Sequence, residues 1–278
     1  MGAPMAGHLA AAGHELTVHN RSAAKTEAWV ARHGGTACST AATAARGRGL
    51  LILCVGRDDD VRQVVEDILE SLAPGAIIVD HTTTSAKLAR DLAGLAARNG
   101  RAFVDAPVSG GEAGARNAQL SIMVGGDATA VECVTPVIGA YAKAIKHMGG
   151  PGAGQLTKMA NQICIAGVVQ GLAEAVAFSR AAGLDSGLVL EAISKGAAQS
   201  WQMDNRWATM ARGEFDFGFA VDWMRKDLGL VLDEARVNGA RVEVTALVDQ
   251  FYAEVQAMGG RRWDTSSLAA RLMKKPGV

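Results

Sequence analysis

The sequence lacks an excess of charge of either sign, since its 278 residues carry 28 Lys plus Arg and 28 Asp plus Glu. This balance argues against nucleic acid or an acidic membrane surface as a partner held by bulk electrostatics. The four cysteines, Cys38, Cys54, Cys133 and Cys164, form no CxxC pair or Cys/His cluster. Neither a metal site nor a disulfide framework is indicated, and small buried thiols in a reducing compartment are expected.

Long hydrophobic runs are also missing. No apolar stretch reaches the length of a membrane span, and no basic segment followed by an uninterrupted apolar one opens the chain. The composition is globular, with 49% apolar and 20% charged residues, and the length suits two domains. We therefore expect a cytoplasmic protein with a sizeable core.

Residues 1–151 alternate between strand and helix patterns. The runs at 50–55 and 76–80 are short and continuously apolar, as expected of parallel strands buried on both faces. Further strands are predicted at 15–19, 102–105 and 120–124, and helices at 4–12, 23–32, 61–72, 85–99 and 128–140. The alternation predicts an α/β domain with a doubly wound parallel sheet of the Rossmann type.

The pattern changes near Gly152. A helical stretch without proline runs from 155 to about 182, and helical periodicity continues to the C-terminus with breaks at glycines 183, 213, 239 and 259–260. We predict a dinucleotide-binding domain at 1–151 and an all-α substrate and oligomerisation domain at 152–278, which begins with a long interdomain helix.

The chain opens on MGAPMAGHLAAAGHELTVHNRS. In a dinucleotide-binding unit, three glycines spaced G-x-G-x-x-G join the first strand to the first helix. If Gly2 is the third of them, the first strand and two glycines fall upstream of Met1. We expect that the start codon is misplaced, and a naturally shortened chain is the alternative.

A residue that reads the cofactor ribose is expected ~20 residues beyond the glycine motif, where Asn20, Arg21 and Ser22 stand, with Lys25 one turn later. Arg21 can pair with a 2′-phosphate through two hydrogen bonds, and Ser22 and Lys25 add donors. No acidic side chain stands there to repel the phosphate. The segment favours NADPH over NADH, and a solvated helix start without a ligand is the alternative.

Two glycine-containing segments carry the candidate chemistry. In DAPVSGGEAGARNAQLSIMVGG, Ser109-Gly110-Gly111 offers a hydroxyl and accessible backbone N–H groups to a carboxylate, unless it is an ordinary turn. In GAGQLTKMANQ, Lys158, Asn161 and Gln162 share one helix face at i, i+3 and i+4, ahead of an apolar stretch. Buried polar groups there must be paired, and the alternative is that all three are exposed.

Three other features are weaker signals. DWMRKDLGL, at 222–230, is by itself typical of an exposed helix face. His81 ends a strand where ligands bind, and a structural or cofactor-side role is favoured over acid–base chemistry. Trp201 and Phe219 are candidates for the substrate pocket, and core positions are the more ordinary interpretation.

Together these segments resemble the β-hydroxyacid dehydrogenase family, which includes 3-hydroxyisobutyrate dehydrogenase and 2-hydroxy-3-oxopropionate reductase. The resemblance covers nearly the whole chain, and the four segments occur in the family's order. It implies reduction of a small semialdehyde acid by hydride transfer, with Lys158 as general acid/base. Ser109, Gly110 and Gly111 would hold the substrate carboxylate with help from Gln162. The cofactor contacts implied are Gly2, Met5, Asn20, Arg21, Ser22, Lys25, Val55, Gly56, Asp60, Thr83 and Lys226.

The sequence departs from the family pattern at some of these positions. Gln162 replaces the Asn of many 3-hydroxyisobutyrate dehydrogenases and resembles the 2-hydroxy-3-oxopropionate reductases, while Ala118 replaces a usual Gly. Val55-Gly56 and Asp60 stand where Leu-Pro and Asn are usual. An imine reductase-like enzyme and a truncated, non-catalytic binding module remain alternatives, although Lys158 favours a carbonyl substrate. The resemblance also implies a homodimer or homotetramer.

Overall fold

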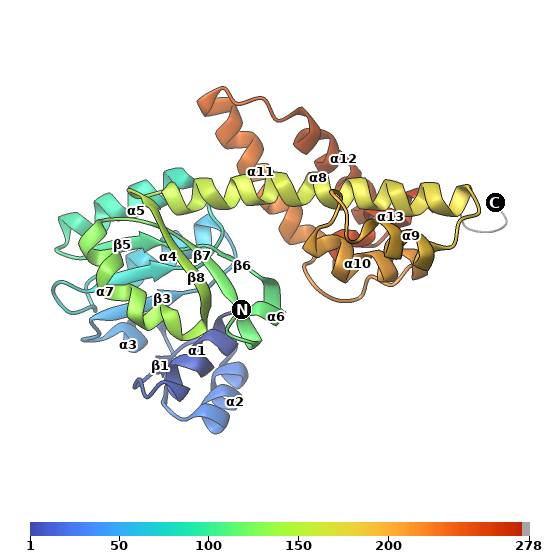
Figure 1. Cartoon of the computed structure of the whole chain (residues 1–278). Coiled ribbons are helices and arrows are strands. Elements are labelled where there is room, and N and C mark those ends of the chain that lie inside the picture. The colour runs from blue at the N-terminus through green and yellow to red at the C-terminus, as the bar shows by residue number, and fades with distance from the viewer. Residues whose placement is uncertain (274–278) are drawn as a thin grey trace. The chain divides into compact units, whose positions relative to one another are not determined.

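The structure, a computed structural model, describes residues 1–273. The chain divides into two compact units, Met1–Lys158 and Met159–Val278, and residues 274–278 of the predicted second domain lie outside the described residues. The division falls inside helix α8 (Ala153–Ala181), drawn in yellow in Figure 1. The first turns of α8 therefore belong to the first unit and the remainder to the second.

A six-stranded sheet forms the centre of the first unit, with the strand order β3-β4-β5-β7-β6 and with β8 beside β7. The strands are β3 (Leu50–Leu53), β4 (Ile77–Asp80), β5 (Ala102–Asp105), β6 (Val108–Ser109), β7 (Leu120–Gly125) and β8 (Ala142–Gly149). Strands β3, β4 and β5 are parallel, and Leu53 lies opposite Asp80, which lies opposite Asp105. The carboxyl ends of these three strands are therefore level.

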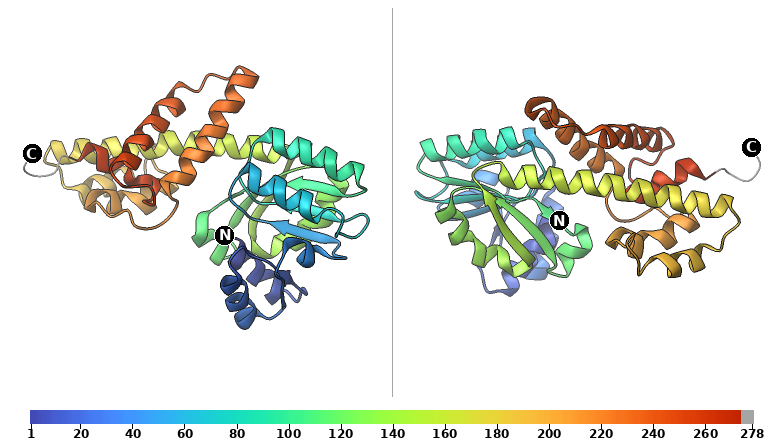
Figure 2. Two further views of the ribbon diagram at one scale, coloured as in Figure 1. Left: turned by 180° about the vertical axis from the view of Figure 1, so that it is seen from behind. Right: turned by 45° about the horizontal axis from the view of Figure 1, so that its top comes forward.

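Helices cover both faces of this sheet (Figure 2). They are α1 (Gly2–Ala11), α3 (Ala41–Ala45), α4 (Asp58–Ile68), α5 (Ala86–Arg98), α6 (Gly111–Arg116), α7 (Ala128–Ile138) and the 3₁₀ turn η1 (Gly139–Tyr141). Ile78 and Phe103 share a core with α4 and α5, whereas their neighbours Val79 and Val104 share another with α1 and α7. Each such side chain contributes about 1.5–3 kcal/mol by burial. The arrangement is a Rossmann fold, as predicted.

The chain between α1 and α3 forms a separate small sheet. Strands β1 (Thr17–Val18) and β2 (Thr36–Ala37) pair in parallel and flank helix α2 (Ala23–His33). Among residues 1–273, no strand joins β1 to β3, so the main sheet ends at β3.

The second unit is helical, which confirms the predicted class. After α8 come α9 (Ser186–Ile193), α10 (Trp201–Arg212), α11 (Val221–Asn238), α12 (Glu243–Ala257), η2 (Thr265–Ser267) and α13 (Leu268–Leu272). One core joins Val169 of α8 with Trp207, Leu228 and Tyr252 from the other helices. Helices α10 and α11 end at Gly213 and Gly239 in the left-handed conformation, which glycine adopts without strain.

The sheet is mixed rather than parallel. Strand β7 runs antiparallel to both β5 and β6. The patterns did not predict β2, β6, β8, α3 or α6. Strands β2 and β6 have two residues each, and β8 is exposed along most of its length, so none carries a continuous apolar run.

Two further features bear on the expectations drawn from composition. Helix α8, with 29 residues and a hydropathy of 1.4 in its most apolar window, is long and apolar enough to cross a membrane. Its residues Ala166, Val169 and Val176 are buried among the other helices, so its packing is that of a core helix. Cys133 and Cys164 are exposed rather than buried.

Candidate active site

The carboxylate of Asp105, at the end of β5, holds the N-terminus of α8. Its Oδ1 accepts the N–H of Gly152 at 2.7 Å, and its Oδ2 accepts the N–H of Gln155 at 2.9 Å. Burial raises the pKa of Asp105, and these backbone hydrogen bonds oppose the rise. Acceptors at this end of a helix satisfy N–H groups that have no partner within the helix.

Two glycines allow this close approach between helix and sheet. A Cβ at Gly154 would lie 2.5 Å from the carbonyl oxygen of Met123, and one at Gly125 would lie 2.6 Å from Oδ1 of Asp105. Neither position has room for a side chain. Close packing of the helix on the sheet therefore requires the second glycine of the GAG sequence before Lys158.

Gln155 ties the segment after β4 to the same helix turn. This fully buried side chain accepts the N–H of Thr84 at 3.0 Å and donates from Nε2 to the carbonyl oxygen of Thr82 at 2.8 Å. Both ends of its amide are used, so its orientation is fixed. These hydrogen bonds fix the HTTTS segment against the start of α8.

Lys158 follows Gln155 by one turn on this anchored part of α8. Its side chain is 7% exposed, and lysine is almost never so buried unless it is paired. Asn161 and Gln162 follow on the same helix face, and Gln162 is 2% exposed. Burial of Lys158 and Gln162 removes the alternative that this group is simply solvated.

The Ser109-Gly110-Gly111 segment leaves β6 and enters α6. Gly110 has a φ of 129° and Gly111 a φ of 61°, conformations that glycine adopts readily. Ser109 is half-buried, and both glycines are exposed. Ala118 has a φ of 53°, the one positive value at a described residue other than glycine. The departure from the family glycine therefore falls at a strained position.

His81 supports the turn that leads to Ser109. One ring nitrogen, Nδ1, lies 2.6 Å from the carbonyl oxygen of Ala106, and Nε2 lies 2.8 Å from the hydroxyl of Tyr141. Burial lowers the pKa of His81 to about 4. The neutral ring donates to Ala106 and accepts from Tyr141, which suits the structural role favoured from the sequence.

Hydrogen bonds join the loops that follow β3 and β4. Val55 donates its N–H to the Thr82 hydroxyl at 3.0 Å, and the hydroxyl of Ser85 donates to Asp58 at 2.5 Å. The predicted residues Gly56 and Thr83 lie within these two loops. Dinucleotides bind beyond the carboxyl ends of parallel strands in such folds, which is where both loops lie.

The Asn20–Lys25 segment joins β1 to α2. Asn20 accepts the N–H of Ser22 at 2.9 Å, and the Ser22 hydroxyl makes no cap hydrogen bond to α2. The side chain of Arg21 is 88% exposed and lies 3.5 Å from Asp60. Such an exposed ion pair contributes about 0–1 kcal/mol. The structure thus places an acidic side chain beside this segment, where the local sequence predicted none.

Of the two residues predicted near the start of the chain, Gly2 packs against the end of β3. A Cβ on Gly2 would lie 3.4 Å from that of Cys54. Met5 is 2% exposed and belongs to the core beneath α1. Its side chain therefore acts in packing.

In the second unit, Gln162 and Lys226 meet at Asp227. Gln162 donates from Nε2 to Oδ2 of Asp227 at 2.7 Å, and Nζ of Lys226 lies 3.1 Å from Oδ1. Of the two pocket candidates here, Trp201 is 58% exposed, which contradicts a core position. Phe219 is half-buried and packs against the core.

Sequence reasoning missed residues that orient the predicted groups within each unit: Asp58, Thr82, Asp105 and Gln155 in the first unit, and Asp227 in the second. Asp105 ends a predicted strand and Thr82 follows one, which are positions where ligand sites form. Gln155 and Asp227 are polar residues in helices with apolar faces, a pattern that signals a buried hydrogen bond.

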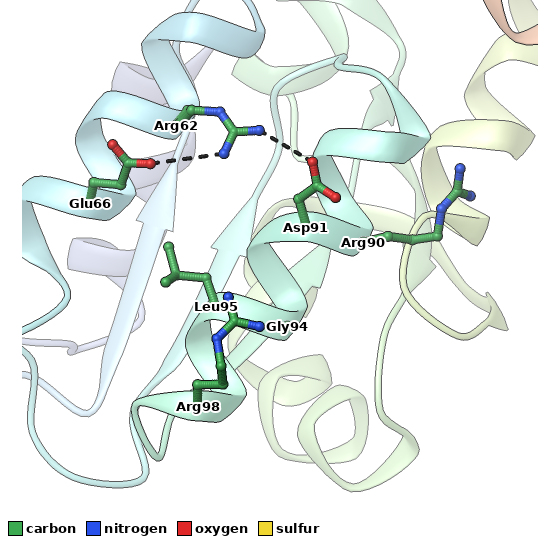
Figure 3. A pocket seen from close by; sticks show the side chains of 7 residues that line it. All are labelled: Arg62, Glu66, Arg90, Asp91, Gly94, Leu95 and Arg98. Atoms are coloured by element: carbon green, nitrogen blue, oxygen red, sulfur yellow. Dashed lines mark hydrogen bonds and ion pairs between the residues drawn. The ribbon is translucent and has the colours of Figure 1, made fainter.

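A separate groove of about 480 Å³ lies between α4 and α5 (Figure 3). It is lined by Arg62, Glu66, Arg90, Asp91, Gly94, Leu95 and Arg98, none of them a predicted site residue. Arg62 pairs with Glu66 and Asp91, and Lys87 lies 2.7 Å from Asp91 and lowers its pKa. Both carboxylates of the groove are thus neutralised.

Comparison with known proteins agrees with this geometry. A family model described as the NAD binding domain of 6-phosphogluconate dehydrogenase matches residues 1–150. Another, described as the NAD-binding domain of NADP-dependent 3-hydroxyisobutyrate dehydrogenase, matches residues 152–272. An uncharacterized oxidoreductase of Shewanella frigidimarina is 59% identical over 99% of this chain and 95% of its own.

Two characterised relatives extend the comparison. The 2-hydroxy-3-oxopropionate reductase of Escherichia coli is 33% identical over 98% of this chain and 94% of its own. The solved structure of Mycobacterium tuberculosis 3-hydroxyisobutyrate dehydrogenase with L-serine is 30% identical, with a TM-score of 0.90, and covers 99% of this chain and 96% of that one. These matches define an enzyme, an oxidoreductase that acts on hydroxyl groups with a nicotinamide cofactor. The chain belongs to the β-hydroxyacid dehydrogenase family.

Proposed function

We propose that this enzyme uses NADPH to reduce a small semialdehyde acid to a β-hydroxyacid, in the manner of a 2-hydroxy-3-oxopropionate reductase or 3-hydroxyisobutyrate dehydrogenase. The observation that carries the proposal is the burial of Lys158 on an anchored helix turn, with Asn161 and Gln162 on the same face. A buried lysine is suited to proton transfer because desolvation favours its neutral form. The proposed location is the cytoplasm, where the four free thiols stay reduced.

The residues of the first unit suit a 2′-phosphorylated cofactor. Arg21, Ser22 and Lys25 are exposed donors at the end of β1, and Arg21 exchanges its weak pairing with Asp60 for the stronger charge of a phosphate. The loops that hold Val55-Gly56 and Thr83 would contact the rest of the cofactor. NAD would bind through the same loops without the contribution of Arg21.

Each group of the proposed site has one role in the reaction. A bound nicotinamide cofactor supplies the hydride. Ser109-Gly110-Gly111 holds the substrate carboxylate with backbone N–H groups. Lys158, as an ammonium, donates a proton to the growing alkoxide, and as a neutral amine it removes the alcohol proton in the reverse direction. Gln162 assists in holding the substrate.

Steady-state kinetics with a panel of semialdehyde acids and hydroxy acids, using NADPH and NADH, tests the proposal. Lys158→Ala should lower kcat about 10²- to 10⁴-fold and leave NADPH affinity within a factor of about two. Arg21→Ala should weaken NADPH binding about 10- to 100-fold and leave NADH binding unchanged, because only the 2′-phosphate contact is lost.

Lys143→Ala removes an exposed lysine of the same unit and is the matched control. It should change neither quantity. Near wild-type turnover by Lys158→Ala would contradict the assignment of the acid/base. Reduction of cyclic imines without reduction of any semialdehyde acid would favour the imine reductase alternative.

A further inference from the structure

Within the first unit, helix α1 contacts the end of α6 through the ring of His8. The Nε2 atom of His8 lies 3.0 Å from the carbonyl oxygen of Ala115 and 3.1 Å from that of Arg116. Carbonyl oxygens only accept hydrogen bonds, so Nε2 carries a hydrogen and donates to both. Ala115 and Arg116 are the last two residues of α6, the helix that begins at Gly111. One side chain of α1 therefore holds the far end of the helix that starts at the proposed carboxylate site.

The carbonyl group of Ala115 depends on this donor. The last carbonyl groups of a helix have no partner within it. Gln119, which follows Ala115 by one helical turn, donates its N–H to Gly114 at 2.8 Å instead. Ala115 is fully buried, so bulk water does not reach its carbonyl oxygen. Without the N–H of His8, this conformation would leave a buried acceptor unsatisfied.

Helix α6 passes a shift of its far end to the turn before it. It has six residues, and helices of that length are not stable by themselves in water. Its other anchor is Leu120 of β7, since a Cβ at Gly110 or at Gly114 would lie 3.2 Å from Cδ2 of Leu120. The N–H of Gly114 donates to the carbonyl oxygen of Gly110 at 2.9 Å. Displacement of α6 therefore disturbs the backbone of Gly110.

We infer that His8 is a positioning residue for the substrate carboxylate. It fixes α6 between α1 and Leu120, and so holds the backbone N–H groups of Gly110 and Gly111 in the arrangement that a carboxylate requires. The inference rests on the proposed function, which assigns the carboxylate to this segment. His8 has no proposed contact with the substrate or with Lys158, so its loss should weaken substrate binding rather than slow the catalytic step.

Two substitutions of His8 separate the donor from the ring. His8→Phe keeps a flat ring without a donor, and we expect KM for the acid to rise about 10-fold while kcat changes by less than about twofold. His8→Gln keeps an N–H donor on a flexible side chain and should recover most of the wild-type KM. An unchanged KM in His8→Phe overturns the inference, and so does an equal rise in both variants.

The affinity for NADPH should stay within a factor of about two of the wild type in both variants. Met5 and Leu9 are buried in the core beneath α1, so they hold this helix independently of His8. Gly2 should therefore keep its place beside β3. A loss of NADPH affinity equal to the rise in KM would show that His8→Phe displaces α1 as a whole, and it would overturn a specific effect on the carboxylate segment.

His147→Phe is the matched control. Nε2 of His147 lies 3.0 Å from the carbonyl oxygen of Gly126 and 2.8 Å from that of Gly149, so this ring also bonds to two backbone carbonyl groups of the first unit. Neither of these partners belongs to α6. The substitution should lower the melting temperature and leave KM for the acid unchanged. An equal rise of KM in His147→Phe would assign the effect to lost stability and overturn the positioning role of His8.

Hydrogen exchange at the Gly114 amide separates failure of this inference from failure of the proposed function. That amide donates to Gly110, so its exchange reports the conformation of the turn. It should exchange slowly in the wild type and in His8→Gln, and about 10-fold faster in His8→Phe. If the wild type reduces no acid with either cofactor, the proposed function fails, and the exchange rates still report whether His8 holds the turn. Equal rates in the wild type and His8→Phe overturn the inference whatever the activity.

Discussion

Buried polar residues of the first unit lie where strands end and loops begin. His81, Asp105 and Gln155 each bond to backbone groups of a segment distant in sequence. An unsatisfied buried donor or acceptor costs about 1–3 kcal/mol. These hydrogen bonds therefore favour the observed conformation of each loop over conformations that would break them. The residues proposed to act on substrate and cofactor are thereby held by residues that have no proposed contact with either.

The titration of His81 should make the free energy of unfolding depend on pH. Its pKa is about 6.5 in the unfolded chain and about 4 in the folded protein. As the pH falls from 6.5 to 4, the unfolded chain takes up a proton that the folded protein excludes, so the free energy of unfolding should fall by about 3 kcal/mol in total. Below the folded pKa this loss should stop. Denaturant unfolding at a series of pH values measures it.

The control is His81→Gln, which removes the titrating group. This variant should be less stable near neutral pH because the hydrogen bonds to Ala106 and Tyr141 are disturbed. Its stability should nevertheless fall less steeply between pH 6.5 and 4 than that of the wild type. An equal slope in both proteins would assign the acid sensitivity to other groups.

At the scale of elements, local pattern predicted the helices and strands that carry an apolar face. Continuous apolar runs located β3 and β4, and the glycine breaks located the ends of α10 and α11. Strand β8 was missed because its exposed edge position requires no apolar run. Motifs were enough to predict Lys158 and Ser109 as site residues. The hydrogen bond from the Gln155 N–H to Asp105 instead joins residues that lie 50 positions apart in the sequence. No local pattern contains such a contact.

Two glycines of α8, one at its start and one at its middle, have different surroundings. Gly154 has no room for a Cβ, whereas Gly167, further along the same helix, has no atom within 4 Å of a built Cβ. Gly154→Ala should push the helix start away from Met123 and Asp105, and lower both the melting temperature and kcat. Gly167→Ala should raise the free energy of unfolding by about 1 kcal/mol, because alanine favours helix.

Thermal unfolding and steady-state kinetics on the two variants check this contrast. Both substitutions add one methyl group to the same helix, one at its first turn and one in its interior. A stabilised Gly154→Ala with normal kcat would show that the contact with the sheet has no role in placing Lys158.

At the scale of the whole molecule, the second unit leaves large apolar side chains uncovered. Phe178 near the end of α8 is 71% exposed, and Leu184 and Leu188, which follow it, are 53% and 67% exposed. Helix α9, which holds Leu188, has no buried residue although its sequence is apolar. Exposed apolar side chains in such numbers are typical of a surface that binds another protein, so we predict that a partner covers this one. A second copy of this chain is the partner that the family resemblance predicts.

Light scattering after size-exclusion chromatography tests this self-association. The wild type should elute as a dimer or tetramer of the 28.8 kDa chain. The double variant Phe178→Asp with Leu188→Asp should shift toward the monomer, because burying two carboxylates without partners costs several kcal/mol. Met148→Asp, which places the same charge on a 41% exposed side chain of β8, should leave the assembly intact. A monomeric wild type at tens of micromolar would contradict the prediction, since a stable interface of ordinary size, about 1,600 Å², holds at that concentration.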